Sequence, residues 1–239
     1  MDLLEERIVS YRSVGLAVCL MVLSQWSVAD DWVLAEAQDG IRISLRDVPD
    51  SGIQAFRATV SIATSLDSIM AVFSDIQACP QWFHQCDESA QIQRDSFAKR
   101  VNYQVSDFPF PAGDRDLVYQ VLLSQDVQSK TITMDIKALP DYCVGQSTPV
   151  CQQVNAADYV RMTKATGFYR FVVTDKGVDV TWQQHTEPGG ALPDWLVNAM
   201  VVDIPRNTLQ GLREIVKQDK YQKAKLAYEA GVAVGFLVK

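Results

Sequence analysis

Few residues in this 239-residue chain combine a reactive side chain with a suggestive position. Arg115 begins an apolar strand, where a buried guanidinium must find an acid or hydrogen-bond acceptors. It could meet the headgroup or carboxylate of a ligand. It could instead pair with Asp114 or Asp116 or donate to backbone carbonyls, and this structural role is favoured. His185 and Glu187 could act as an acid–base pair, but polar positions at the rim of a sheet are the favoured interpretation.

The motifs of most enzymes are missing from the sequence. It contains no nucleophile elbow, no phosphate-binding glycine loop, no metal-ligand cluster and no carboxylate dyad. Of its two histidines, His84 and His185, only His185 is a candidate catalytic base. This absence favours a binding protein over an enzyme.

The N-terminus resembles a targeting segment. Residues 14–23 are an apolar run that is short for a membrane span, and Arg7 and Arg12 precede it. Ser27-Val28-Ala29 then offers a cleavage site. Three acidic residues before Arg7 depart from the usual pattern, so an uncleaved anchor stays open as an alternative. We expect residues 1–29 to be a signal peptide and the protein to be secreted or periplasmic.

The cysteines indicate disulfide bonds. Removal of the leader would remove Cys19 and leave an even number: Cys79, Cys86, Cys143 and Cys151. Three pairings are possible in an oxidising compartment, and closeness in sequence favours Cys79–Cys86 and Cys143–Cys151. A zinc site is the weaker alternative, because neither pair has the Cys-x2-Cys spacing and only His84 lies between two cysteines.

Composition limits the classes of partner. The chain carries 22 basic and 29 acidic side chains, a net charge of −7, and is 48% hydrophobic. Such a chain can bury the core of one medium-sized domain. An acidic chain without basic clusters argues against nucleic acid and against strong electrostatic docking on anionic lipid.

The order of elements positions these residues on a single sheet. Short strands from Trp32 precede a helix capped by Ser65, and a helix or turn begins at Cys79. At least four more strands follow, interrupted by a polar segment, residues 140–157, which we expect to be a surface loop. The last strand ends at His185. The pattern predicts an α+β domain whose curved antiparallel sheet wraps a C-terminal helix.

The segment after His185 should control the final helix. Gly189 and Gly190 supply positive φ for a turn and could also let the helix swing open. Apolar residues then recur at helical spacing: Leu192, Trp195, Leu196, Ala199 and Met200. Pro205 should bend this helix or reset its start. The tail, residues 221–239, is also expected to be helical. It could extend the helix and pack on the domain, or contact a membrane or partner.

Four segments of the chain resemble the signatures of one family, in the same order. They are Asp75 to Trp82; Pro109 to Asp116, with Arg115-Asp116; Tyr159 to Tyr169, with Val160-Arg161; and Glu187 to Asn198. The chain thereby resembles the START domain, the lipid-transfer module named after the steroidogenic acute regulatory protein, within the helix-grip superfamily. The resemblance extends from about Trp32 to Lys217.

The resemblance implies a START-like domain over residues 30–220, followed by a C-terminal extension, 221–239. It implies a tunnel between sheet and final helix that holds one hydrophobic molecule, without metal or cofactor. On this basis, the expected ligand contacts are Arg115, Tyr119, Ile132, Met134, Ile136, Trp195, Ala199 and Met200, with Gly189 and Gly190 as the gate. Expected partners are a lipid or other apolar small molecule and, transiently, a membrane; a monomer is expected.

Three functions are consistent with these observations. The favoured one is an exported carrier that encloses an apolar molecule and shields it from water. The second is an enzyme of the aromatase/cyclase kind on the same scaffold, which would need Arg115 and His185 aimed inward. The third is an interaction module that captures a partner through residues 221–239.

Overall fold

One large sheet forms the body of the protein. The computed structural model describes residues 31–110 and 112–237, so the predicted signal peptide, residues 1–29, lies outside the described residues. The strands of this sheet are β1 (Val33–Gln38), β2 (Ile41–Arg46), β3 (Ala55–Ile62), β4 (Cys86–Arg94), β5 (Lys99–Ser106), β6 (Arg115–Asp126), β7 (Thr131–Ala138), β8 (Val160–Arg161), β9 (Lys164–Thr174) and β10 (Gly177–Glu187). Their order is β1-β2-β3-β10-β9-β7-β6-β5-β4, antiparallel throughout, and β8 pairs in parallel with β6.

Helices cover one face of this sheet. They are α1 (Leu66–Ser74), the 3-10 helix η1 (Ile76–Gln81), α3 (Asp194–Ile215) and the short α4 (Asp219–Gln222). Ser65 caps α1 as predicted, because its Oγ accepts a hydrogen bond from the Ser68 amide at 3.1 Å. Within residues 31–110 and 112–237, no helix is both long and apolar enough to span a bilayer.

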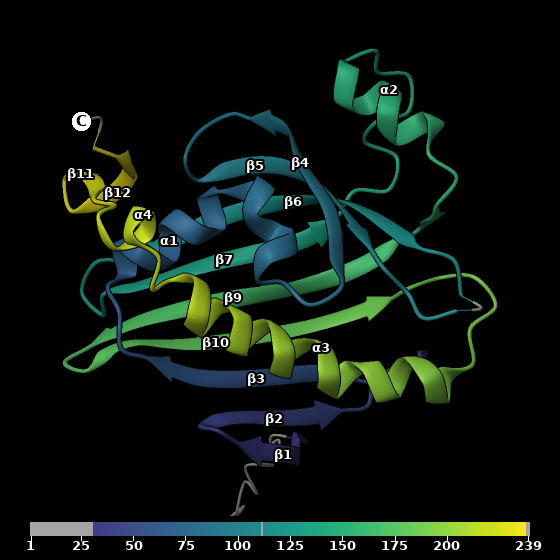
Figure 1. Ribbon diagram of the computed structural model, residues 1–239, viewed down its shortest axis with the longest axis horizontal. Helices are drawn as coiled ribbons and strands as arrows, with labels where there is room; N and C mark the ends of the chain where they lie inside the picture. Colours follow the sequence, from purple (N-terminus) through teal and green to yellow (C-terminus); the bar gives the residue numbers. More distant parts are fainter. Residues whose placement is uncertain (1–30, 111, 238–239) are drawn as a thin grey trace, which may run out of the picture. The chain divides into compact units, whose positions relative to one another are not determined.

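The long helix α3 lies over the sheet and contacts β3 and β2 (Figure 1). Its C-terminal half is anchored by Leu209, Leu212 and Ile215, all buried. Gly211 allows a close approach, since a Cβ there would come within 2.1 Å of the Trp82 carbonyl oxygen. The helix continues through Pro205 instead of restarting there. Pro205 is buried, and its packing contributes stability against the lost backbone hydrogen bond.

Residues 140–157 are not simply a surface loop. They contain α2 (Pro149–Ala156), which contacts β4 and whose buried residues pack on the face of β5 and β6 that points away from the cavity. Cys143 and Cys151 form a disulfide with an S–S distance of 2.05 Å, and both are fully buried. They pack with Val154 against outward-facing side chains of β5 and β6: Val101, Tyr103, Val105 and Val118. The prediction of a loop outside the core was wrong because its polar composition concealed these three anchors.

Cys79 and Cys86 form the second disulfide, at an S–S distance of 2.15 Å. Both pairs therefore match the predicted pairing. The bond joins η1 to the start of β4 and fixes the segment that carries Trp82.

The predicted helical tail is instead a β-hairpin. Strands β11 (Leu226–Glu229) and β12 (Val232–Phe236) pair antiparallel after α4. Between them, Ala230 and Gly231 have φ values of 49° and 83°, the combination that closes a two-residue hairpin turn. The apolar run that suggested a helix includes β-branched Val232 and Val234, which suit a strand. The hairpin packs on the domain, and Phe236 meets Phe97 with ring centroids 5.8 Å apart.

Candidate ligand-binding site

A cavity lies between the inner face of the sheet, the α1–η1 segment and α3. Its volume is about 160 Å³, close to that of engineered apolar cavities that hold one benzene. The α3 wall consists of Val197, Met200, Val201 and Ile204, which recur at helical spacing. The sheet contributes an apolar floor: Phe56, Leu117, Val121, Met134, Ile136, Tyr169 and Trp182. The space between sheet and helix is thus not filled by the protein's own side chains.

Aromatic rings form one end wall of the cavity. Trp182 stacks on Tyr169 with centroids 4.8 Å apart and nearly parallel planes. Phe73 of α1 meets Tyr169 edge-on at 4.8 Å and Trp82 at 5.1 Å. Trp182 is buried, and its indole N–H donates to Gln184 at 2.9 Å. The wall is mostly apolar, and the Trp182 indole donor is already used, whereas the Tyr169 hydroxyl is buried without a partner among the described residues.

A polar stripe runs along the opposite wall. Its members are the inward-facing side chains of β5: Arg100, Asn102, Gln104 and Ser106, all buried and all lining the cavity. The alternate residues of β5 face outward to the α2 cluster described above. The alternation of β5 is therefore inverted, with polar residues facing the cavity and apolar residues facing the covered outer surface.

Arg100 is the charged residue of this stripe, and it is only 2% exposed. Its Nη1 donates to the Ser74 hydroxyl at 3.3 Å. Among the residues that the structure describes, no hydrogen-bond partner reaches its Nε or Nη2. Burial lowers the pKa of Arg100 to about 10, and the charge of Arg94 contributes in the same direction.

Neutral polar groups surround the guanidinium. The Asn102 Oδ1 and the Tyr169 hydroxyl are buried and also lack partners within the described part of the chain. Burial raises the pKa of Tyr119, while a hydrogen bond from Asn102 and the charge of Arg100 oppose this rise. The Tyr169 pKa is raised mainly by burial and further by Tyr119. Tyr119 therefore links Arg100, Asn102 and Tyr169 into one polar cluster.

Arg115 lies at one end of the site, outside the cavity lining. It is 3% exposed and donates from Nη1 to the Gly113 carbonyl and from Nη2 to the Gly189 carbonyl, the latter at 3.4 Å. Its guanidinium lies 4.7 Å from the Phe108 ring centroid. Burial lowers its pKa, and Asp114 acts in the opposite direction. The side chain thus joins the β5–β6 loop to the turn before α3, which is the structural role favoured from the sequence.

The turn before α3 has the conformation that its glycines allow. Gly189 and Gly190 have φ values of 70° and 71°. Asn198 then fastens the first turns of α3 to the β2–β3 loop. Its Oδ1 accepts from the Gln54 amide and its Nδ2 donates to the Gly52 carbonyl, both at 3.0 Å. The role of the two glycines as a gate stays a prediction.

Comparison with known proteins identifies the family. The model of the START domain family matches residues 17–222. The chain belongs to the START domain family. The STAR-related lipid transfer protein from Xanthomonas axonopodis (fragment 25–204) is 32% identical, with a TM-score of 0.68 over 79% of this chain and 100% of that chain.

Further relatives of this START protein support the assignment. An uncharacterized protein of Pseudomonas aeruginosa is 31% identical over 208 residues, covering 87% of this chain and 97% of the relative. Human STARD10 is 15% identical, with a TM-score of 0.63 over 80% of this chain and 74% of that chain, and shows the fold alone. The predicted START resemblance and α+β helix-grip fold are confirmed.

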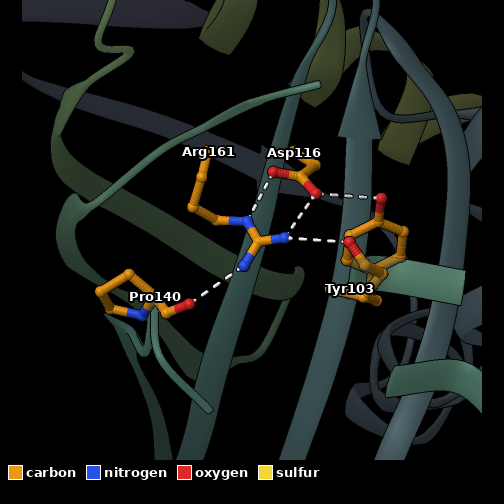
Figure 2. A network of polar contacts seen from close by, with 5 residues as sticks. Tyr103, Asp116, Pro140 and Arg161 are labelled. Carbon is orange, nitrogen blue, oxygen red and sulfur yellow. Dashed lines mark hydrogen bonds and ion pairs between the residues drawn. The ribbon is translucent and has the colours of Figure 1, made fainter. Parts of the chain in front are cut away.

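Two of the START-like segments meet on the outer face of the sheet (Figure 2). Arg161 donates from Nε and Nη2 to the two carboxylate oxygens of Asp116, at 2.6 and 2.9 Å, and the Tyr103 hydroxyl donates to the same carboxylate at 3.1 Å. The Pro140 carbonyl accepts from Arg161 Nη1 at 3.0 Å and the Val154 carbonyl from Nη2 at 3.4 Å. The hydrogen bonds that Arg161 donates to the Asp116 carboxylate raise the pKa of Arg161. Burial, with help from Asp116, raises the pKa of Tyr103.

The expected ligand contacts of this START domain divide into two groups. Four line the cavity: Tyr119, Met134, Ile136 and Met200. Four lie outside its lining: Arg115, Ile132, Trp195 and Ala199. Trp195 is 72% exposed and Ala199 is also exposed, because α3 turns a different set of residues inward. Residues 195–202 are apolar on nearly every side of the helix, so spacing alone did not determine which side is buried.

The polar residues near the turn lie at the rim. His185 Nε2 is 3.2 Å from the Ser51 hydroxyl, and Glu187 forms an ion pair with Lys164 at 2.8 Å. That interaction lowers the pKa of Glu187. Neither side chain lines the cavity. His84 lines it, but nowhere in residues 31–110 and 112–237 do three histidine, cysteine or acidic side chains gather as they would around a metal.

Sequence reasoning missed Arg100 and the polar stripe. The sequence predicted a short strand at residues 98–105 but assigned no role to its polar face, and a polar face normally indicates solvent. The signal lay in the apolar face of the same strand, with Val101, Tyr103 and Val105. That face needs a cover, and the disulfide-bonded α2 segment supplies it.

Proposed function

We propose that this START protein binds one lipid or other hydrophobic molecule in the cavity and carries or shields it in water. The cavity between sheet and α3, with its mostly apolar lining, is the observation that supports this function. Each Å² of apolar surface removed from water contributes about 25 cal/mol to binding. The name of the Xanthomonas relative, a STAR-related lipid transfer protein, is consistent with the proposal.

Entry requires movement of the α3 end. The cavity has room for a group of about benzene size, so a longer ligand must displace part of its wall. The wall nearest the glycine turn is held by Arg115 and by the two hydrogen bonds of Asn198. These contacts are few and polar, and water can replace them when the turn opens. We infer that Gly189 and Gly190 serve as the hinge of this motion.

Transient membrane contact is part of the proposal. Phe110 is 96% exposed in the loop that precedes β6, and Trp195 is exposed at the start of α3. Arg115 connects the loop before β6, which carries Phe110, to the turn that precedes α3 and Trp195. Large apolar side chains beside a gate suit brief insertion into a bilayer surface, where a ligand could enter or leave without crossing water.

Export completes the proposed setting. The two disulfides Cys79–Cys86 and Cys143–Cys151 suit an oxidising compartment. Together with the leader-like residues 1–29, they support a secreted or periplasmic carrier.

The enzyme alternative has less support. An aromatase/cyclase mechanism would need Arg115 and His185 aimed at the substrate. Both lie outside the cavity lining, and Arg115 is occupied by the carbonyls of the turn. The four polar residues of β5 that face the cavity include no acid–base pair.

Native mass spectrometry of the purified protein tests the function. We expect 1:1 complexes with co-purified or added medium-chain amphiphiles. Val201→Trp should fill the cavity and abolish these complexes while circular dichroism shows a folded chain. Ala199→Trp, on the exposed side of the same helix, is the matched control and should bind normally. No complex with any apolar ligand would contradict the proposal.

A further inference from the structure

Arg100 is a buried charge without a counter-charge. Removing a guanidinium from water is costly unless an acid or several acceptors compensate it. Arg100 has one such contact, to Ser74, and two donor nitrogens facing no partner in the described part of the chain. The cavity lining contains one described acid, Asp75, and its carboxylate already accepts from Lys220 and Tyr221, each at 2.9 Å. An arrangement of this kind suits an anionic ligand.

The geometry of the free donors indicates which anion. Nε and Nη2 lie on the same edge of a guanidinium, and their two parallel N–H bonds match the two oxygens of a carboxylate. The protein shows this match on the other face of the same sheet. There, Arg161 uses Nε and Nη2 to hold both carboxylate oxygens of Asp116 (Figure 2). In Arg100 the two equivalent nitrogens are buried and have no hydrogen-bond partner among the described residues.

Neighbouring groups extend the site beyond one side chain. The Tyr169 hydroxyl, which lines the same cavity as Arg100, can donate a further hydrogen bond to an oxyanion. Asn102 Oδ1 can accept from a hydroxyl next to the anion. The rest of the lining is the apolar floor and the α3 wall. The polar cluster around Arg100 and the apolar part of the cavity together suit a molecule with one charged end and one apolar end.

We propose that Arg100 binds the carboxylate of a small or medium-sized amphiphile, such as a single-chain fatty acid, whose apolar part occupies the cavity. This inference rests on the proposed carrier function and adds the chemical class of the ligand. A carboxylate matches the charge of Arg100, the one cationic side chain among the described residues that line the cavity. The modest volume favours one chain over the two chains of a phospholipid.

The test compares ligands that differ only in the headgroup. Calorimetric titration at pH 8 would use decanoate, decanol, methyl decanoate, decyl phosphate and acetate. Decanoate should bind about 10- to 100-fold more tightly than decanol or the methyl ester, the advantage expected for charge-assisted hydrogen bonds. Acetate should bind far more weakly, because it lacks the apolar chain. Decyl phosphate should bind more weakly than decanoate.

Variants assign the effect to Arg100. Arg100→Met should reduce decanoate affinity to that of decanol and leave decanol binding nearly unchanged. Arg170→Met is the matched control, since it removes the same charge from an exposed position and should retain the preference for decanoate. Thermal unfolding verifies that both variants fold.

The possible failures are distinguishable. If neither decanoate nor decanol binds, the carrier function itself is contradicted. If both bind equally, or if Arg100→Met keeps the preference, the function stands and the role of Arg100 is overturned. If decyl phosphate binds more tightly than decanoate, the assignment of the ligand's charged group as a carboxylate is overturned. If acetate binds as tightly as decanoate, the claim that the ligand has an apolar chain in the cavity is overturned.

Discussion

Two arginines on opposite faces of the same sheet have opposite surroundings. Arg161, on the outer face, meets the Asp116 carboxylate and two backbone carbonyls. Arg100, on the inner face, meets a single hydroxyl. The outer arginine completes a network that the protein supplies by itself, whereas the inner one has donors to spare. The comparison suggests that a buried charge is structural where the chain provides its partner and available to a ligand where it does not.

The two sites also differ in their support. The outer network lies beside the Cys143–Cys151 disulfide and the α2 cluster, which exclude water from the Asp116 carboxylate, 1% exposed. The inner site faces a cavity that α3 closes and that, in our proposal, opens near Asn198. Rigid packing thus accompanies the satisfied charge, and the wall that we propose to move accompanies the unsatisfied one.

The largest effect is expected from breaking the outer pair. Arg161→Met leaves the buried Asp116 carboxylate with the Tyr103 hydroxyl as its side-chain partner. Loss of one member of a buried pair should lower the free energy of unfolding by about 3–5 kcal/mol. Urea denaturation measures this value. A loss below about 1 kcal/mol would mean that the network contributes little.

Removal of the outer disulfide should have the next largest effect. Cys143→Ala with Cys151→Ala should lower the free energy of unfolding by about 2–3 kcal/mol, because the unfolded chain gains freedom and α2 loses its anchor. The preference for decanoate should persist, since the inner cluster lies on the other face. Loss of that preference in a folded variant would show that the two faces are coupled.

Arg100→Met, the same substitution at the inner arginine, should change the free energy of unfolding in the opposite direction. Arg100→Met removes an uncompensated buried charge and should raise the free energy of unfolding of the ligand-free protein by about 1–3 kcal/mol at pH 8. Urea denaturation of wild type and variant without ligand measures the difference. Destabilisation of the size expected for Arg161→Met would show that Arg100 is a structural residue.

The smallest effect concerns pH. The Arg100 pKa is lowered from its ordinary value to about 10 in the folded protein. Below pH 10 the guanidinium is charged in both folded and unfolded states, so its burial destabilises the fold fully. Above pH 10 the folded state loses this proton before the unfolded state does, and the destabilisation decreases. The stability advantage of Arg100→Met should therefore shrink from pH 8 to pH 10.5 by less than about 1 kcal/mol. If urea denaturation shows the same stability difference between Arg100→Met and wild type at both pH values, the buried charge is not the cause of that difference.

The sequence predicted the parts of the fold that short motifs determine. Ser65 before an apolar run indicated a helix start, and the cysteine spacing indicated both disulfides. The four START-like segments indicated the sheet and the final helix. These features depend on residues that are close together in the sequence, so they can be predicted from it directly.

Other features depend on what covers each surface. The polar face of Lys99–Ser106 points into a cavity because the α2 segment covers the apolar face of the same strand. This cover depends on the tertiary packing of a segment that is distant in the sequence. The buried side of α3 was misjudged at Trp195 and Ala199 because residues 195–202 are apolar almost all round. The tail was predicted as a helix because its apolar residues outweighed the Ala230-Gly231 turn signal.

A crystal structure of the protein with decanoate tests the central claim most directly. The account predicts carboxylate oxygens about 2.7–2.9 Å from Nε and Nη2 of Arg100, with the alkyl chain between the sheet and α3. A decanoate bound elsewhere, or with its carboxylate at the Gly189-Gly190 turn and its chain against Arg100, would contradict it.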